Sequence, residues 1–130
     1  MPPQNLEAEE SVLGAMLIDR FAGGTVDLLD AYATPIPVTV IAELLGVDPA
    51  RTPDLLAWSH AMVGMYQFAR STAVEEAANA AAAAFAAFIG AEIASRRLAR
   101  RDDLLSHLVA AEIDGARLGD EEIVSTAILL

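Results

Sequence analysis

The chain has 130 residues, enough for one domain with a modest core, and its formal net charge of −11 disfavours nucleic-acid phosphates as a general partner. It contains no cysteine, which excludes disulfides, thiolate metal sites and a cysteine nucleophile. The hydrophobic share is 55% but the aromatic share only 5%, and this alanine-rich balance favours helices.

Neither the first residues of the sequence nor its longest apolar run suggests a secreted or membrane-spanning protein. The first ten residues, MPPQNLEAEE, are acidic and have no basic stretch, so a secretory signal is not expected. The longest apolar run, Ala80 to Ala91, has about half the length that a membrane span requires. We therefore expect a cytoplasmic protein with no membrane partner.

The N-terminal third predicts two helices. The first is expected over Asn5–Arg20 and ends at a Gly-Gly pair. Residues Thr25–Ala33 fit either a short extended piece or a turn of helix. The second helix is expected to begin at Pro35 behind a Thr34 cap and to end at Gly46.

The central third predicts a helix pair. Asp48-Pro49 and Thr52-Pro53 are two start signals for a third helix, and Gly64–Ser71 is predicted to be a loop with bulky side chains. Thr72 and Glu75 have the spacing of a capping box at the start of the longest helix, Ala73–Arg100. The expected buried stripe of that helix consists of Phe85, Phe88, Ile89 and Ile93.

The C-terminal third predicts two more helices around a turn. Asp102 is expected to cap one helix, and an Asp-Gly turn between Ile113 and Leu118 indicates a hairpin. The last helix is expected to begin with Asp120 as its cap, and no stop signal follows. The predicted fold is therefore all-α, a single domain over 1–130 with about six helices in an irregular orthogonal bundle and at most one short hairpin.

The residues that could carry chemistry have simpler structural explanations. His60 and His107 fall on separate predicted helices without metal-ligand spacing, so no metal site is expected. The run RRLARR, Arg96 to Arg101, could contact nucleic acid, but completing a helix end and pairing with Glu92 explains it better. All eight basic residues are arginine, which we attribute to genome composition. The Glu9-Glu10 and Glu121-Glu122 pairs are read as first-turn acidic residues, and no serine has triad spacing.

From about residue 20 onward, several strings resemble the interior of a bacterial cytochrome P-450, a haem-thiolate monooxygenase. They are YATPIPVTVIAELLGVDPA, LLAWSHAMV and DDLLSHLVAAEIDGARLGDEEIVSTAILL, in the family's order. The resemblance implies helix E at Pro35–Leu45, helix F at Thr52–Val63, helix G at Ala73–Arg100, helix H at Asp103–Ala111 and the start of helix I from Glu121. It also implies that Tyr66, Gln67 and Phe68 lie in the loop between helices F and G, which covers the substrate pocket in that family.

Residues Pro2–Asp19, PPQNLEAEESVLGAMLID, are similar instead to the start of the DnaB-type replicative DNA helicase. There this segment is the first helix of a domain that joins subunits and engages primase. The two resemblances together imply a composite chain, with the join between Met16 and Phe21. Either an engineered recombinant or a fused reading frame would produce it.

The resemblance implies that the monooxygenase chemistry lies outside these residues. The family's haem-ligating cysteine, its Glu-x-x-Arg pair and the oxygen-activating residues of helix I would all follow Leu130, and Trp58 is not the family's haem-propionate tryptophan because residue 62 is Met. We therefore assign no catalytic, cofactor-binding or metal residue and no small-molecule substrate, and expect haem only in the full-length parent family.

Three functions follow from this reading. The first is a cytochrome P-450-derived helical domain without catalysis of its own. The second is a homo-oligomer or interaction module, with interface candidates at Leu6, Val12, Leu13, Met16, Leu17, Ile128 and Leu130. The third and weakest is helicase- or primase-related binding through residues 2–19.

Overall fold

The computed structural model describes residues 11–12, 14–16, 18–19, 25–113 and 115–130. The chain divides into two compact units, Met1–Ile41 and Ala42–Leu130. The predicted break at Gly23-Gly24, the Glu9-Glu10 pair and the interface candidates Leu6, Leu13 and Leu17 lie outside the described residues.

In the first unit, the described part of the predicted Asn5–Arg20 helix is helical through Ile18. Leu29–Ala33 forms a short π-helix, η1, so the helical alternative for Thr25–Ala33 is the correct one. Asp27 opens it by accepting the backbone N–H of Leu29 through Oδ1 at 2.9 Å. The Thr34 cap was wrong: Thr34 has helical φ and ψ of −77° and −46°, and its N–H donates to the Leu29 carbonyl at 2.8 Å. Its backbone continues the helix instead of opening one.

Helix α2, Pro35–Leu45, begins at the predicted proline and runs across the boundary between the two units. Gly46 ends it with a φ of +70°, as predicted from its place after the last apolar residue. Asp48 then caps a 3₁₀ turn, η2 (Pro49–Arg51), by accepting the Ala50 N–H at 2.9 Å.

Helix α3 covers Thr52–Val63, with Thr52 as its first residue and Pro53 in the first turn. The predicted loop after it starts as a 3₁₀ turn, η3 (Gly64–Tyr66). Helix α4 follows as Thr72–Leu98. The capping box at Thr72 was wrong, because Thr72 is already helical. Ser71 is extended and accepts the Val74 N–H at 3.4 Å, while Glu75 pairs with Arg70 at 3.0 Å.

Helix α5, Leu104–Ala110, is capped by Asp103 and not by Asp102 as predicted. Asp103 has the extended φ and ψ of a cap, −142° and 163°, and its Oδ1 accepts the Ser106 N–H at 2.7 Å. The predicted hairpin is confirmed as strands β1 (Glu112–Ile113) and β2 (Ala116–Arg117), an antiparallel pair whose turn holds Gly115 at a φ of +80°.

Helix α6 covers Asp120–Leu129. Its cap is Gly119, whose N–H donates to the Glu122 carboxylate at 2.8 Å. Asp120 is therefore the first helical residue and not the cap, although the predicted start of the helix is correct.

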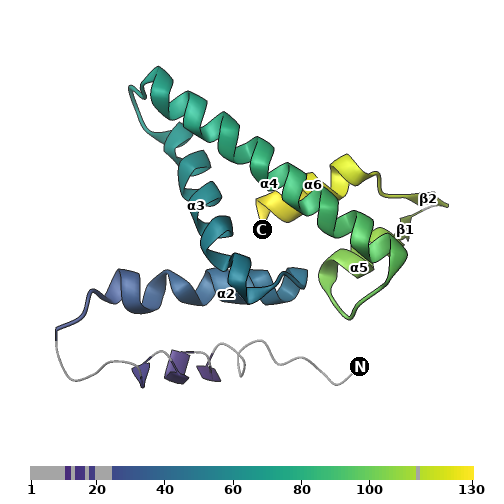
Figure 1. Cartoon of the computed structure of the whole chain (residues 1–130), viewed down its shortest axis with the longest axis horizontal. Coiled ribbons are helices and arrows are strands. Elements are labelled where there is room, and N and C mark those ends of the chain that lie inside the picture. Colours follow the sequence, from purple (N-terminus) through teal and green to yellow (C-terminus); the bar gives the residue numbers. More distant parts are fainter. Residues whose placement is uncertain (1–10, 13, 17, 20–24, 114) are drawn as a thin grey trace. The chain divides into compact units, whose positions relative to one another are not determined.

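Within 42–130, α4 is the central element (Figure 1). Helix α3 packs along α4, and α5 and α6 pack on α4 and on each other. The core of this unit includes five fully buried aliphatic side chains: Leu45, Ile89, Ile93, Leu105 and Ile123. Of the predicted α4 stripe, Phe85, Ile89 and Ile93 are buried and Phe88 is half-buried. The predicted all-α class with one short hairpin is confirmed.

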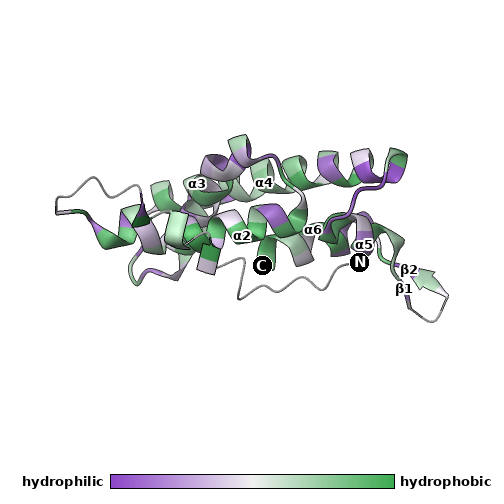
Figure 2. Ribbon diagram, turned by 90° about the horizontal axis from the view of Figure 1, so that it is seen from below, coloured by the Kyte–Doolittle hydropathy of each residue, from purple (hydrophilic) through white to green (hydrophobic). Residues whose placement is uncertain are grey.

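Hydrophobic residues recur along α4, and hydrophilic ones gather towards its C-terminal end (Figure 2). By length and composition alone, α4 is the one helix of the described chain that is apolar enough to cross a membrane. The expectation based on the Ala80–Ala91 run therefore underestimated the length of this apolar helix. A core helix of a soluble protein meets the same condition, and the stripe through Phe85, Ile89 and Ile93 is buried against neighbouring elements.

Candidate functional site

The predicted lid residues Tyr66, Gln67 and Phe68 lie in the connection between α3 and α4. Tyr66 is 89% exposed and Phe68 is 101% exposed, so both aromatic rings project into solvent. The Gln67 N–H donates to the Gly64 carbonyl at 3.2 Å, and two residues later Ala69 adopts a left-handed φ of +57°. Apart from the ion pair between Arg70 and Glu75 at its end, this connection offers mainly apolar contact area.

An aromatic contact packs together the two helices that this connection links. The Trp58 ring of α3 lies 5.4 Å from the Phe85 ring and 5.7 Å from the Phe88 ring, both on α4. Arg51 places its guanidinium carbon 5.1 Å from the Phe88 ring centroid. Tilted aromatic pairs and a cation over a ring add to the area buried between helices. The exposed loop therefore joins two helices that are packed by their largest side chains.

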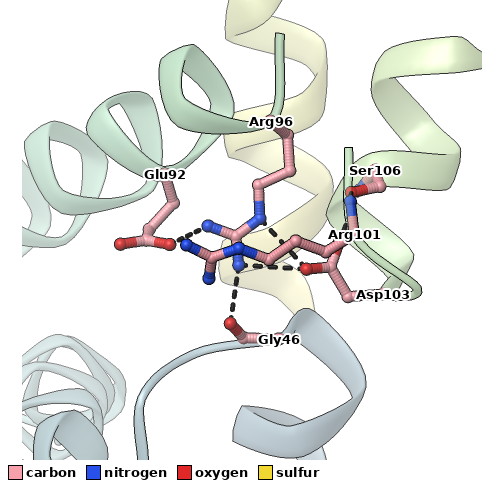
Figure 3. Close-up of polar contacts among 6 residues, drawn as sticks. All are labelled: Gly46, Glu92, Arg96, Arg101, Asp103 and Ser106. Atoms are coloured by element: carbon pink, nitrogen blue, oxygen red, sulfur yellow. Dashed lines mark hydrogen bonds and ion pairs between the residues drawn. The ribbon is translucent and has the colours of Figure 1, made fainter. Parts of the chain in front are cut away.

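A cluster of polar side chains lies at the C-terminal end of α4 (Figure 3). We call it the Arg96 cluster: Gly46, Glu92, Arg96, Asp103 and Ser106. The Arg96 side chain is fully buried. Its Nε donates to Asp103 Oδ2 at 3.0 Å, its Nη1 pairs with Glu92, and its Nη2 donates to the Gly46 carbonyl at 2.6 Å. One guanidinium thus joins three segments of the chain.

Opposing effects set the ionisation of Asp103. Desolvation by burial raises the pKa of Asp103, whereas the hydrogen bonds with Ser106 and the Arg96 guanidinium lower it. The net result is a pKa below the ordinary aspartate value. Asp103 is therefore the ionised partner of Arg96 as well as the cap of α5.

The close approach of the Gly46 turn to this cluster depends on the absence of a side chain. A Cβ placed on Gly46 would lie 2.1 Å from Asp103 Oδ2 and 2.5 Å from Asp103 Cβ. Gly46 also has a φ of +70°, which disfavours a side chain. Both constraints fall on the residue whose carbonyl accepts from Arg96.

The Arg96 cluster has no unused polar capacity for a ligand. Among the described residues, no buried side-chain nitrogen or oxygen is left without a hydrogen-bond partner. A guanidinium that is satisfied by two carboxylates and a carbonyl holds the fold together rather than binding a substrate. The cluster is structural.

Sequence reasoning anticipated only part of this cluster. The predicted pairing of the arginine run with Glu92 is confirmed at Arg96, and Arg97 pairs with Asp120 of α6. The burial of Arg96 was missed, as were the roles of Gly46 and Asp103. No local signal singled out Asp103, because Asp102 and Asp103 each precede by three residues a backbone N–H that a cap could accept.

The remaining candidates are dispersed. His60 lies on α3 and His107 on α5, both exposed, and the described residues contain no group of three His, Asp or Glu side chains that could hold a metal ion. Of the interface candidates, Val12 is 60%, Met16 55% and Leu130 50% exposed, while Ile128 is half-buried.

Curated relatives of the chain are bacterial cytochromes P450. It is 38% identical over 115 residues to cytochrome P450 107B1 of Saccharopolyspora erythraea, covering 88% of this chain and 27% of that protein. It is 38% identical to the steroid C26-monooxygenase of Mycobacterium tuberculosis strain CDC 1551, over 95% of this chain and 34% of the relative. The match to the vitamin D(3) 25-hydroxylase of Pseudonocardia autotrophica, at 34% identity, spans 100% of this chain and 30% of the relative. No protein-family model matches the chain.

The solved structures that the chain resembles are also cytochromes P450. The ligand-free cytochrome P450 TbtJ1 superposes with a TM-score of 0.85 at 36% identity, over 95% of this chain and 32% of that one. The open form of cytochrome P450 EryK from S. erythraea gives 0.83 at 34% identity, over 95% and 32%. Because 95% of the chain is covered, these matches include part of residues 2–19, the segment that resembles a helicase. The resemblance of that segment to a helicase stays a prediction. The chain spans about a third of the length of the relatives it matches, and over that span it is similar to a fragment of bacterial cytochromes P450.

Proposed function

We propose that these 130 residues are a cytochrome P450-derived helical domain without catalysis of its own. The observation that supports this most strongly is the coverage, since the chain accounts for 27% of cytochrome P450 107B1 and 34% of the M. tuberculosis steroid C26-monooxygenase. A fragment of this size lacks most of the structure with which such relatives act. The relatives' names refer to different substrates, a steroid and vitamin D(3) among them, so they single out none for this chain.

The donor set does not fit a haem-thiolate centre. Haem of this class is held by a cysteine thiolate, and the 130 residues contain no cysteine. The two histidines are exposed on different helices of the described chain and are not gathered around one site. The residues present therefore do not fit a haem-thiolate group. A cytoplasmic location stays part of the proposal, and its support is the match to bacterial cytochromes P450.

A haem titration tests this proposal. The purified chain is mixed with haemin, reduced and exposed to carbon monoxide, and the absorption spectrum is recorded. We expect no band at the thiolate position, and such a band would overturn the proposal. A variant carrying His60→Ala and His107→Ala is the matched control, because it removes binding of haem through surface histidines.

Within a complete cytochrome P450, we propose that Tyr66, Gln67 and Phe68 contribute to the cover of the substrate pocket. The support is the family resemblance of this part of the sequence and its place in the α3–α4 connection, where the Tyr66 and Phe68 rings are exposed. Grafting residues 64–71 into a full-length relative tests this. A changed substrate KM with unchanged folding supports the role, and unchanged KM values for all substrates contradict it.

Self-association is the second candidate function. The exposed Val12 and Met16, four residues apart in a helical stretch, could form one apolar strip, and association would remove it from water. Sedimentation velocity at several concentrations tests this, with Val12→Glu plus Met16→Glu as the variant and Ser125→Glu on α6 as the control. A strict monomer throughout would refute the proposal.

Helicase- or primase-related binding through residues 2–19 is the remaining candidate. Its only support is the similarity of that stretch to a helicase start. Replacing residues 1–19 with an unrelated helix tests it, and unchanged binding to helicase and primase would dispose of it.

A further inference from the structure

The middle and the C-terminal end of α4 are held by different kinds of contact. Towards its middle, Phe85 and Phe88 pack on Trp58 of α3 through apolar and ring contacts. Near its C-terminal end, the buried Arg96 holds the Gly46 carbonyl and the Asp103 carboxylate. The first kind of contact is insensitive to protons, and the second depends on the ionisation of carboxylates.

We propose that the Arg96 cluster is an acid-sensitive conformational switch: protonation of its carboxylates releases α5 and the Gly46 turn from the end of α4 while α3 and α4 stay packed. The proposal rests on the geometry of the cluster and is independent of the proposed P450 function.

The charge balance explains why acid opens the cluster. Arginine stays protonated at every accessible pH, so the buried guanidinium needs a negative partner. Its two partners are Asp103, whose side chain is 3% exposed, and Glu92, whose side chain is 26% exposed. When Asp103 becomes neutral, the buried cation keeps only the partly exposed Glu92 and the Gly46 carbonyl as partners, and weakening the pairing of a buried charge is strongly destabilising. Opening lets water solvate Arg96.

Helix α5 is the element that responds because it depends on Asp103 most. It has only seven residues, and a helix of that length is not stable without tertiary contacts. Asp103 supplies both its N-cap, through Ser106, and its link to α4, through Arg96. A single protonation therefore weakens two contacts that hold α5.

Other charged groups near the cluster are exposed. Asp102 and His107 form an exposed pair at 3.8 Å, and Arg97 pairs with Asp120 of α6 at the surface. Glu43, Asp48 and Arg101 flank the cluster in the sequence with exposed side chains. The Arg101 backbone N–H also donates to Ser106 Oγ at 2.9 Å, and its side chain extends toward Glu92 and Arg96 (Figure 3). Water screens the charges of these exposed groups, so among the described residues Glu92 and Asp103 have the strongest influence on Arg96.

Hydrogen exchange at two places tests the switch. Exchange is followed by mass spectrometry between pH 7 and pH 3, corrected for the intrinsic rate, in peptides covering 104–110 and 52–63, with Trp58 fluorescence as a third probe. We expect protection of 104–110 to fall at least about tenfold at a higher pH than protection of 52–63 or Trp58 emission. Loss of all three signals in one step would overturn the proposal.

Variants separate the switch from general acid unfolding. Asp103→Asn should lower protection of 104–110 at least about tenfold at pH 7 with Trp58 emission unchanged. Glu92→Gln should keep that protection at pH 7 but move the acid step to higher pH, because Asp103 is then the sole anionic partner. Asp120→Asn, with the same charge change at an exposed pair, should behave as wild type. Wild-type protection in Asp103→Asn, or a simultaneous loss of Trp58 packing, would refute the inference.

Discussion

Gly46→Ala is expected to be among the most destabilising substitutions of a small residue in this chain. At a φ of +70°, alanine costs about 1 kcal/mol relative to glycine. The new Cβ would lie 2.1 Å from Asp103 Oδ2 and 2.6 Å from Asp103 Cγ, so the carboxylate must move away. Separating a buried pair such as Asp103 and Arg96 costs about 3–5 kcal/mol. The sum is about 4 kcal/mol or more, a large part of the 5–15 kcal/mol that stabilises a typical domain.

Urea unfolding followed by circular dichroism measures this change. Gly115→Ala is the matched control, because Gly115 also has a positive φ, +80°, but its added Cβ meets nothing within 4 Å. Gly90→Ala is a second control: it lies inside α4 with open space around it and should stabilise by about 0.5–1 kcal/mol. If Gly46→Ala costs no more than Gly115→Ala, the contact between Gly46 and Asp103 does not hold the fold in the way described.

Three further predictions concern separate parts of the chain. Ser71→Ala should cost about 1 kcal/mol in thermal unfolding and Thr72→Ala less than half of that, because Ser71 is the cap of α4; equal costs would contradict the assignment. Ile89→Ala, at a fully buried position, should cost about 2–5 kcal/mol, against less than about 0.5 kcal/mol for Leu98→Ala at a site that is 91% exposed, and the same melts check both. Since the pKa of Asp103 is lowered by folding, its contribution to stability is present above its unfolded value and is lost as pH falls through the folded value, so urea midpoints should drop below about pH 4 in wild type and much less in Asp103→Asn.

The helices of the chain were predictable because their boundaries are local. Pro35, Gly46 and the Asp-Gly turn act through backbone conformations that neighbouring residues do not change. The caps were harder to predict where two capable residues are adjacent. Ser71 and Thr72 can both accept a first-turn N–H, as can Asp102 and Asp103, and the residue with extended φ and ψ becomes the cap. Sequence pattern places such a start within one residue but does not choose between the pair.

The Arg96 cluster was not predictable from local pattern. Glu92 and Arg96 have the spacing of an exposed ion pair on a helix, and nothing in that spacing indicates burial. Burial arises because Gly46, 50 residues earlier in the chain, brings its carbonyl to Arg96 Nη2. The lid residues Tyr66, Gln67 and Phe68 came from family resemblance, and the pattern alone indicated only a loop with bulky side chains.

The contacts of Arg96 restrict which residue can occupy position 96. Three nitrogens of one planar guanidinium serve three separate acceptors, on Glu92, Asp103 and Gly46. A lysine ammonium is a point charge and cannot match that fork, whereas an exposed partner such as Arg97 could exchange with lysine at little cost. Whatever the codon preference, the geometry at position 96 therefore demands arginine.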